Sequence, residues 1–194
     1  MRTLRPALVL FALFTLVCGV VYPLAVTGVA RVAWPAQARG SVVRVDGRAV
    51  GSTLVGQAFT SPGYLWGRPS ATGYDAHTSG GTNLGPRDPR LIAALTERAA
   101  TLAATAPGRA VPIELITASA SGLDPHVSPA AARFQIDRIA AARGAAPAAV
   151  AALIEAAVEA PSLGFLGAAR VNVLAVNLAL DRQLGQLGST RAVQ

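Results

Sequence analysis

The side chains that could carry out catalysis are concentrated in one short polar segment, residues 117–126. Ser119, Ser121, Asp124 and His126 lie within it, and serine, histidine and aspartate are the members of a hydrolase triad. A hydrolase nucleophile lies in a Gly-x-Ser-x-Gly turn between a strand and a helix, and this segment lacks that pattern. We therefore expect these residues to shape turns. The alternative function is a membrane-anchored serine hydrolase that uses Ser121 and His126.

A glycine-rich loop at residues 79–86 is the second segment that could bind a ligand. Its sequence is SGGTNLGP, and successive backbone N–H groups in such a loop can form a concave site for an anion. A Walker phosphate loop requires Gly-Lys-Ser/Thr, whereas this chain has no lysine. We therefore expect a tight structural turn here in preference to a Walker-type nucleotide site.

The composition disfavours metal and nucleic-acid binding. The two histidines, His77 and His126, lack the spacing and the neighbouring cysteines of a transition-metal site. The one cysteine, Cys18, lies in an apolar segment, so the rest of the chain can form no disulfide. All 17 basic residues are arginines scattered singly, and the net charge of +7 comes without a basic run. This pattern does not indicate a nucleic-acid surface.

The N-terminal region contains one apolar segment that is long enough to cross a membrane. Residues 7–30 include no charged side chain and lie between Arg5 and Arg31. At about 1.5 Å per residue a helix of this length spans roughly 36 Å, which exceeds the roughly 30 Å hydrocarbon core. We therefore predict a transmembrane helix at residues 7–30, preceded by a short cytoplasmic N-terminus at 1–6 and followed by a linker at 31–40.

A cleaved signal peptide is the competing interpretation of this segment. Ala36-Gln37-Ala38 offers a small-x-small cleavage site, and cleavage there would release an exported binding domain. The apolar cores of signal peptides run only about 7 to 15 residues, so we favour an uncleaved anchor. The flanking arginines do not fix its orientation. Large C-terminal domains translocate largely regardless of charge, so we expect the domain outside the plasma (inner) membrane.

The remainder of the chain predicts a single small α+β domain at residues 41–186, with helices packed on a short sheet. Asp46-Gly47 between two apolar runs predicts a hairpin with a two-residue type I′ turn. The loop from residue 56 to residue 89 is rich in glycine and proline, and its aromatic residues indicate that it is ordered. We expect residues 187–194 to form a flexible tail.

Capping patterns predict the helices of this domain. Asp88 and Ser128 can each cap a helix, and each is followed by a proline. We therefore expect one helix to start at each of them. We expect the second of these to run unbroken to Arg143, where Gly144 ends it. The first helix is expected to bury an apolar stripe. That stripe is Leu91, Ile92, Leu95 and Leu102.

Three further segments complete the predicted secondary structure. A third helix follows Pro147 and stops before Pro161. Residues 170–184 favour a helix over a strand, with Asn172 as the N-cap and a glycine as the stop. Residues 111–117 resemble a strand.

Read together, the loops and helix starts contain six motifs in one order, and they extend from the apolar segment to about Asp181. Together they resemble the KdpC family, the C subunits of Kdp potassium-transporting P-type ATPases. One departure is Ala120, where the family usually has glycine, and we expect Ala120 at negative φ. The motifs are Gly56-Gln57-x-Phe59 with Pro62 and Tyr64, GRPSA at 67–71, SGGTNLGP at 79–86, TASASGLDPH at 117–126, Gln135-x-x-Arg138 with Ala142-Arg143-Gly144, and RVNVL at 170–174 with Asn177.

The resemblance implies a subunit of a high-affinity, ATP-driven potassium importer that also contains a channel-like A subunit, a P-type ATPase B subunit and a small F subunit. The chain has no Asp-Lys-Thr-Gly phosphorylation motif, and one helix cannot enclose a path for an ion through hydrocarbon. We therefore expect an assembly and regulatory subunit without catalytic activity, metal or stably bound cofactor. Small residues would let its helix approach partner helices closely. They are Gly19, Ala25 and Gly28.

The family is also described as a catalytic chaperone that raises the ATP affinity of the B subunit. A domain outside the membrane meets no ATP, so such an effect must be a coupling free energy between subunits, with ATP bound only through the ATPase subunit. Direct nucleotide binding by this chain is the further hypothesis that the resemblance raises. Its candidate residues are Ser79, Gly80, Gly81, Asn83 and Gln135.

Overall fold

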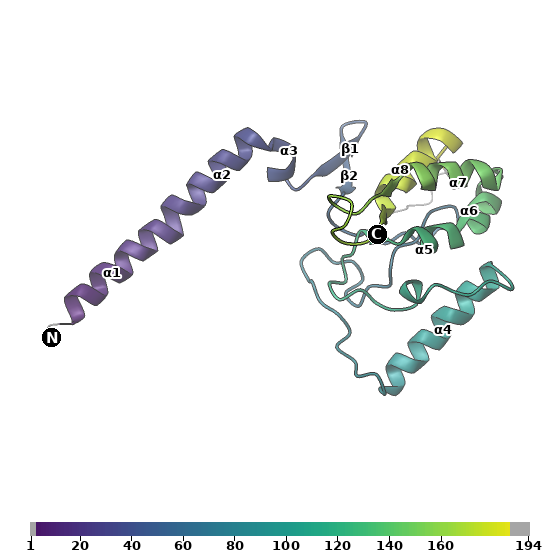
Figure 1. Cartoon of the computed structure of the whole chain (residues 1–194), viewed down its shortest axis with the longest axis horizontal. Coiled ribbons are helices and arrows are strands. Elements are labelled where there is room, and N and C mark those ends of the chain that lie inside the picture. The colour runs from purple at the N-terminus through teal and green to yellow at the C-terminus, as the bar shows by residue number, and fades with distance from the viewer. Residues whose placement is uncertain (1–2, 187–194) are drawn as a thin grey trace. The chain divides into compact units, whose positions relative to one another are not determined.

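A computed structural model describes residues 3–186 and divides the chain into two compact units, with the boundary between Val50 and Gly51 (Figure 1). The first unit is mainly helical, and the second holds the α+β domain. The expected tail at 187–194 lies outside the described residues. The elements of the first unit, with the strand that crosses the boundary, are α1 (Leu4–Leu16), a π-helical turn (Val17–Val21), α2 (Tyr22–Ala33), α3 (Pro35–Ala38), β1 (Val42–Val45) and β2 (Arg48–Ser52).

The apolar segment forms one continuous helix, Leu4–Ala33, made of α1, the π-helical turn and α2. It is 30 residues long, with a mean hydropathy of 2.4 in its most apolar window, so its length and composition suit a membrane span. The predicted span 7–30 lies within it. None of its residues is buried. The π-helical turn ends at Val21, just before Tyr22 and Pro23, and proline cannot donate a backbone hydrogen bond to the preceding turn.

The hairpin predicted around Asp46-Gly47 is confirmed. Strands β1 and β2 pair with each other, and the two turn residues have φ values of 50° and 77°. Positive φ at both central positions is the signature of the type I′ turn, which aspartate and glycine tolerate.

The second unit is an α+β domain, as the sequence predicts. Its antiparallel sheet has the order β3-β5-β4, with Val171 of β5 opposite both Val127 and Val158. In Figure 1 helix α4 lies on one side of the domain, away from helices α5 to α8. The elements are α4 (Pro89–Thr105), a 3₁₀ turn (Ile113–Leu115), β3 (His126–Val127), α5 (Pro129–Phe134), α6 (Ile136–Arg143), α7 (Pro147–Ala156), β4 (Val158–Glu159), β5 (Arg170–Asn172) and α8 (Val173–Leu184).

The predicted helix starts are confirmed by their caps. Asp88 accepts a hydrogen bond from Arg90 N at the start of α4, and Ser128 accepts one from Ala131 N at the start of α5. Asn172 accepts one from Ala175 N at the start of α8. These bonds satisfy backbone N–H groups that have no partner within the helix.

Two predictions of secondary structure are wrong. Residues 111–117 form a 3₁₀ turn at Ile113–Leu115, because Pro112 cannot donate to a strand ladder and its carbonyl accepts from Leu115 N. The helix expected from residue 129 to residue 143 is broken at Gln135, which separates α5 from α6 with φ −92° and ψ −3°. The Gln135 side chain bonds elsewhere in the domain, as described below.

The core of the domain lies between the sheet and helices α5 to α8. Helix α4 contributes only Leu102 as a buried residue, and Ile92 of the predicted stripe is 53% exposed, so that part of the stripe is wrong. The fully enclosed side chains are Leu65, Ile139, Ile154, Leu180, Gln135, Val150, Val171, Val176 and Asn177. Two of these are polar amides, and both hold one segment of the long loop.

Candidate functional site

Side chains of two helices, α6 and α8, and of Gln135 hold a short loop segment, residues 62–66, by its backbone. We call this arrangement the clamp. Carbonyl or N–H groups of all five residues of the segment bond to side chains of helices α6 and α8 and of Gln135 between α5 and α6. The four side chains that provide these bonds are Gln135, Arg138, Arg143 and Asn177. A buried loop can persist only when its backbone polar groups find such partners, so the clamp fixes the path of the long loop.

Gln135 uses its whole amide within the clamp. Its Oε1 accepts from Trp66 N at 2.9 Å and from Arg138 Nη2 at 2.6 Å, while its Nε2 donates to Trp66 O at 3.1 Å and to Ala131 O at 3.2 Å. An amide side chain offers two donors and two acceptor sites, so these four bonds saturate it. The Gln135 side chain is buried. This geometry gives it a structural role.

Arg138 lies between the loop backbone and an aromatic ring. Its guanidinium stacks on Trp66, 3.6 Å from the ring centroid, and donates to Pro62 O and to Tyr64 O. No carboxylate pairs with it among the salt bridges of residues 3–186. Burial lowers the pKa of Arg138 to about 10 because desolvation disfavours the charged form.

Arg143 and Asn177 complete the clamp. The Arg143 side chain is 1% exposed, donates to Gly63 O at 2.6 Å and pairs with Asp181 at 2.8 Å. Asp181 also accepts from the Tyr64 hydroxyl at 3.0 Å, and burial together with this bond raises the pKa of Tyr64. Asn177 accepts from Leu65 N at 2.7 Å and donates to Leu65 O at 3.0 Å, as a neighbouring strand would.

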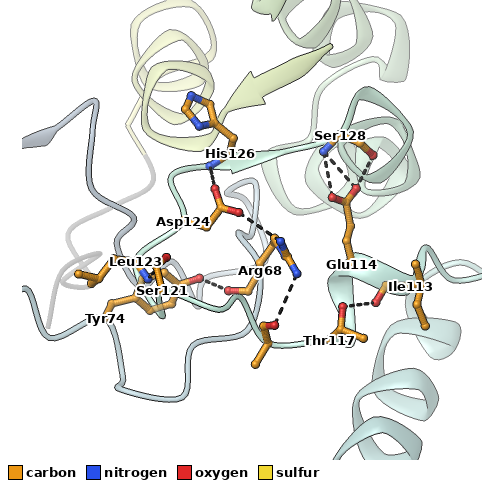
Figure 2. A network of polar contacts seen from close by, with 11 residues as sticks. Arg68, Tyr74, Ile113, Glu114, Thr117, Ser121, Leu123, Asp124, His126 and Ser128 are labelled. Atoms are coloured by element: carbon orange, nitrogen blue, oxygen red, sulfur yellow. Dashed lines mark hydrogen bonds and ion pairs between the residues drawn. The ribbon is translucent and has the colours of Figure 1, made fainter. Parts of the chain in front are cut away.

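A second group of polar contacts holds the next part of the loop, residues 68–81, to residues 118–126. We call it the turn cluster, and Figure 2 displays its centre, where Arg68 and Asp124 point toward each other. Arg68 Nη1 lies 3.3 Å from Asp124 Oδ2, and Asp124 Oδ1 accepts from His126 N at 3.0 Å. The Tyr74 hydroxyl donates to Arg68 O. Burial raises the pKa of Tyr74 to about 12, with a contribution from the Asp124 charge.

Close backbone approach characterises the rest of the turn cluster. Gly80 N donates to Ser121 O at 2.8 Å, and Ser70 Oγ donates to Gly122 O at 2.7 Å. Gly122 has φ 69°, and a Cβ there would lie 2.6 Å from Thr72 Oγ1. Ala120 does not have a positive φ, as predicted from the departure at this position.

The serine hydrolase alternative lacks its geometry. Ser121 Oγ accepts a hydrogen bond from Leu123 N at 3.1 Å, which closes a local turn. The His126 ring points away from Ser121 in Figure 2, and its Nε2 lies 3.4 Å from Asn172 Nδ2. The structure therefore does not bring Ser121 and His126 together, and their segment shapes turns as expected.

The nucleotide candidates fall in two separate places. Ser79 and Gly80 are tied to Ser121 O, while Asn83 adopts φ 53° in the same exposed loop. Gly81 packs close to Ala120, with 3.2 Å between its hypothetical Cβ and the Ala120 carbonyl oxygen. Gln135 belongs to the clamp and has no free donor or acceptor. The nucleotide hypothesis stays a prediction that only the loop residues can carry.

A groove of about 580 Å³ opens between the loop and helix α4. None of the five nucleotide candidates lines it. Its wall combines aromatic and charged side chains, and one of these, Arg98, donates to Ile116 O at 3.0 Å. The aromatic and charged lining residues are Phe59, Trp66, Arg68, Tyr74, Glu97 and Arg98.

Comparison with known proteins decides the family. The chain matches the family of the K+-transporting ATPase c chain, KdpC, over residues 4–182. The chain belongs to the KdpC family. The potassium-transporting ATPase KdpC subunit of Polaromonas naphthalenivorans (strain CJ2) is 57% identical over 183 residues, which cover 92% of this chain and 93% of that protein. The KdpC subunit of Caulobacter vibrioides (strain NA1000 / CB15N) is 55% identical, and the match covers 97% of this chain and 97% of that protein. The KdpC subunit of Geobacter sulfurreducens is 49% identical, and the match covers 93% of this chain and 98% of that protein.

The motifs by which this chain resembles KdpC proteins coincide with the clamp and the turn cluster. Gln135-x-x-Arg138, Arg143 and Asn177 form the clamp. The sequence did not predict that role. The spacing of Gln135 and Arg138 by three residues, and of Asn177 and Asp181 by four, places each pair on one helical face and was the available signal. The Arg68–Asp124 pair has no local signal, because 56 residues separate its members.

The predicted docking residues of this KdpC family member lie on the apolar helix. Gly19 lies in the π-helical turn and Ala25 and Gly28 lie in α2, and all three are exposed. A Cβ at either glycine would have no heavy atom within 4 Å. Their role in helix packing stays a prediction.

Proposed function

We propose that this chain is an assembly and regulatory subunit of a potassium-transporting ATPase complex and has no catalytic chemistry of its own. One observation carries the proposal: a chain of the KdpC family presents a 30-residue apolar helix on which no side chain is buried. Such a helix needs lipid or other helices around it. The polar residues of the clamp and of the turn cluster bond to the loop, which supports a structural role for them.

In this proposal the helix spans the plasma (inner) membrane with its N-terminus in the cytoplasm and the domain outside. It packs beside helices of the channel-like A subunit, the P-type ATPase B subunit and the small F subunit. Association between helices in lipid depends on close packing, so small residues at the contact matter most. Gly19, Ala25 and Gly28 are the candidates, and Ala25 and Gly28, which are three residues apart in α2, share one face.

The direct test is co-purification in mild detergent, with an affinity tag on this chain and the neighbouring genes expressed together. The expected result is stoichiometric recovery of an ATPase that contains an Asp-Lys-Thr-Gly motif. Gly28→Leu should reduce this recovery, whereas Val26→Leu, at an exposed site that already holds a large apolar residue, should not. Recovery of the chain alone, of a free esterase activity, or of a mature chain beginning at Arg39 would contradict the proposal.

We also propose that the subunit raises the ATP affinity of the ATPase through coupling between subunits. The KM for ATP should be higher for the complex that lacks this chain than for the whole complex. Asn83→Ala separates coupling from direct contact, because its exposed side chain is a nucleotide candidate outside the clamp. Under coupling, the variant complex keeps the KM of the wild type. A raised KM in a fully assembled Asn83→Ala complex would favour direct binding by the loop.

A further inference from the structure

An exposed apolar tip projects from the hairpin that joins β4 to β5. We call residues 161–167 the hairpin tip. Its three large side chains are mostly in solvent: Leu163 is 82% exposed, Phe165 is 74% exposed and Leu166 is 52% exposed. Single exposed apolar residues are common, but three within four positions form a patch of the kind that marks a contact surface.

The hairpin tip is nevertheless well ordered by its backbone. Ser162 and Leu166 exchange two hydrogen bonds, of 3.0 and 2.9 Å, and Gly164 N donates to Pro161 O at 3.0 Å. Leu163 has φ 55°, a left-handed conformation that disfavours a side chain such as leucine. The turn therefore holds Leu163 in an unfavourable backbone conformation while its apolar side chains lie in water. Backbone strain of this kind is concentrated at functional sites.

The base of the hairpin is polar and paired, while the tip carries no charge. Glu159 and Arg170 lie opposite each other in the register of β4 and β5, and their side chains form an ion pair at 2.9 Å. No charged residue lies between these two positions. A surface that receives the tip must therefore be uncharged.

The size of the tip indicates how it is used. Three side chains of this kind bury on the order of 400 Å², far less than the roughly 1,200–2,000 Å² of a stable interface. A second copy of this chain would not be held in solution by the tip alone. The tip can, however, hold a partner that the apolar helix already keeps nearby, because tethering makes the second contact an intramolecular one.

Two such neighbours exist beside an anchored helix, the bilayer and a partner subunit, and the tip fits the subunit. Fluid hydrocarbon accepts an apolar loop of any shape, so it does not account for the strained turn at Leu163. A protein pocket of fixed shape favours a preorganised loop. Segments that lie in the membrane surface also carry Lys or Arg among their apolar residues, and the hairpin tip has neither.

We propose that the hairpin tip docks into an uncharged apolar pocket on a partner subunit of the potassium-transporting ATPase complex. The proposal rests on the proposed function, since it requires that complex. Phe165 fills the pocket, and Leu163 and Leu166 exclude water around it, in the manner of an interface hot spot.

Photocrosslinking in the purified complex tests this contact. The phenylalanine analogue p-benzoylphenylalanine replaces Phe165 in one preparation and Ile113 in the control. Ile113 is 67% exposed in the same domain and has an apolar side chain of similar exposure. The expected result is an adduct from position 165 to one apolar peptide of a partner subunit, absent from position 113. Adducts to lipid, to a second copy of this chain, or to nothing in an assembled complex would overturn the proposal.

Substitution gives an independent measurement. Leu163→Asp with Phe165→Asp should lower recovery of the partner subunits after detergent washing at least about ten-fold, and Ile113→Asp should not. Matching circular dichroism spectra establish that both variants are folded. Recovery of the double variant at the wild-type level overturns the hairpin-tip proposal alone. Failure of the wild-type chain to recover any partner overturns the proposed function instead.

Discussion

The clamp and the turn cluster hold successive parts of one long loop by different means. In the clamp, long side chains of α6 and α8 and of Gln135 reach buried and half-buried backbone groups of residues 62–66. In the turn cluster, glycines let two loop segments approach closely, and half-exposed groups add short polar contacts. Loss of a clamp side chain leaves unpaired groups in the interior, whereas a side chain added at a turn-cluster glycine creates steric strain without removing a hydrogen bond. The two regions should therefore respond very differently to substitution.

Arg138→Met should have the largest effect. The substitution keeps an apolar stem against Trp66 but leaves the carbonyls of Pro62 and Tyr64 without donors. The bonds to Tyr64 O and to Gln135 Oε1 are buried and the bond to Pro62 O is half-buried. Each buried acceptor left unpaired costs about 1 to 3 kcal/mol, so we expect a loss of about 3 to 5 kcal/mol. Urea unfolding of the full chain in detergent, followed by circular dichroism, measures it. A loss no greater than that of Arg133→Ala, at an exposed ion pair, would show that the clamp is not a buried network.

Asn177→Leu should be the next largest. Leucine has nearly the same size and leaves the N–H and the carbonyl of Leu65 without partners, so we expect a loss of about 2 to 4 kcal/mol. The same unfolding experiment measures it. Arg138→Met and Asn177→Leu act on one segment, so the double variant should lose less than the sum of the two. Strict additivity would argue against a single cooperative clamp.

Gly122→Ala tests the turn cluster, and its effect should be smaller. The added Cβ meets Thr72 Oγ1 at 2.6 Å and Gly80 O at 2.8 Å, on a backbone with φ 69°. Strain of this kind costs about 1 to 3 kcal/mol. Gly108→Ala is the matched control because its φ is 78° with no atom within 4 Å. The difference between the two variants in midpoint temperature isolates the close approach, and equal midpoints would contradict it.

Helix starts could be read from the sequence because they depend on local chemistry. Asp88 before Pro89 and Asn172 before an apolar run each satisfy nearby N–H groups, and the structure has both caps. The hairpin turn at Asp46-Gly47 is equally local, since two residues determine its φ values. The break at Gln135 was not predictable in this way. Its side chain bonds to Trp66, 69 residues away, and no local pattern records that contact.

The candidate site was less accessible to sequence reasoning than the fold. The motifs that resemble KdpC proteins were visible, but nothing in them indicated which residues bond to the loop backbone. Gln135 is the example: an amide in a motif was a nucleotide candidate, and it proves to be saturated by internal bonds. The hairpin tip was not predictable from the sequence, because its unusual property is the exposure of its side chains, which residue types alone do not indicate.

The smallest expected effect concerns pH and compares the two regions directly. Burial raises the pKa of Tyr74 in the turn cluster to about 12 from its usual 10. Its protonated form is therefore favoured in the folded state, and its contribution to stability is complete below pH 10 and is lost between pH 10 and pH 12. Arg138 in the clamp acts in the opposite direction, since its pKa falls to about 10 and the folded state favours its neutral form. The contribution of Arg138 to the free energy of unfolding therefore rises as the pH increases above 10.

Tyr74→Phe separates the two contributions. The variant loses the hydroxyl contact with Arg68 at every pH, which shifts its stability by a constant amount. It also loses the titration, so its stability should fall less steeply than that of the wild type between pH 10 and pH 12. The chain has no lysine, and that window is therefore clear of lysine titration. Unfolding midpoints at pH 9, 10, 11 and 12 give the slope of stability against pH for each protein. Parallel curves for the wild type and the variant would place the Tyr74 hydroxyl in water instead of in the turn cluster.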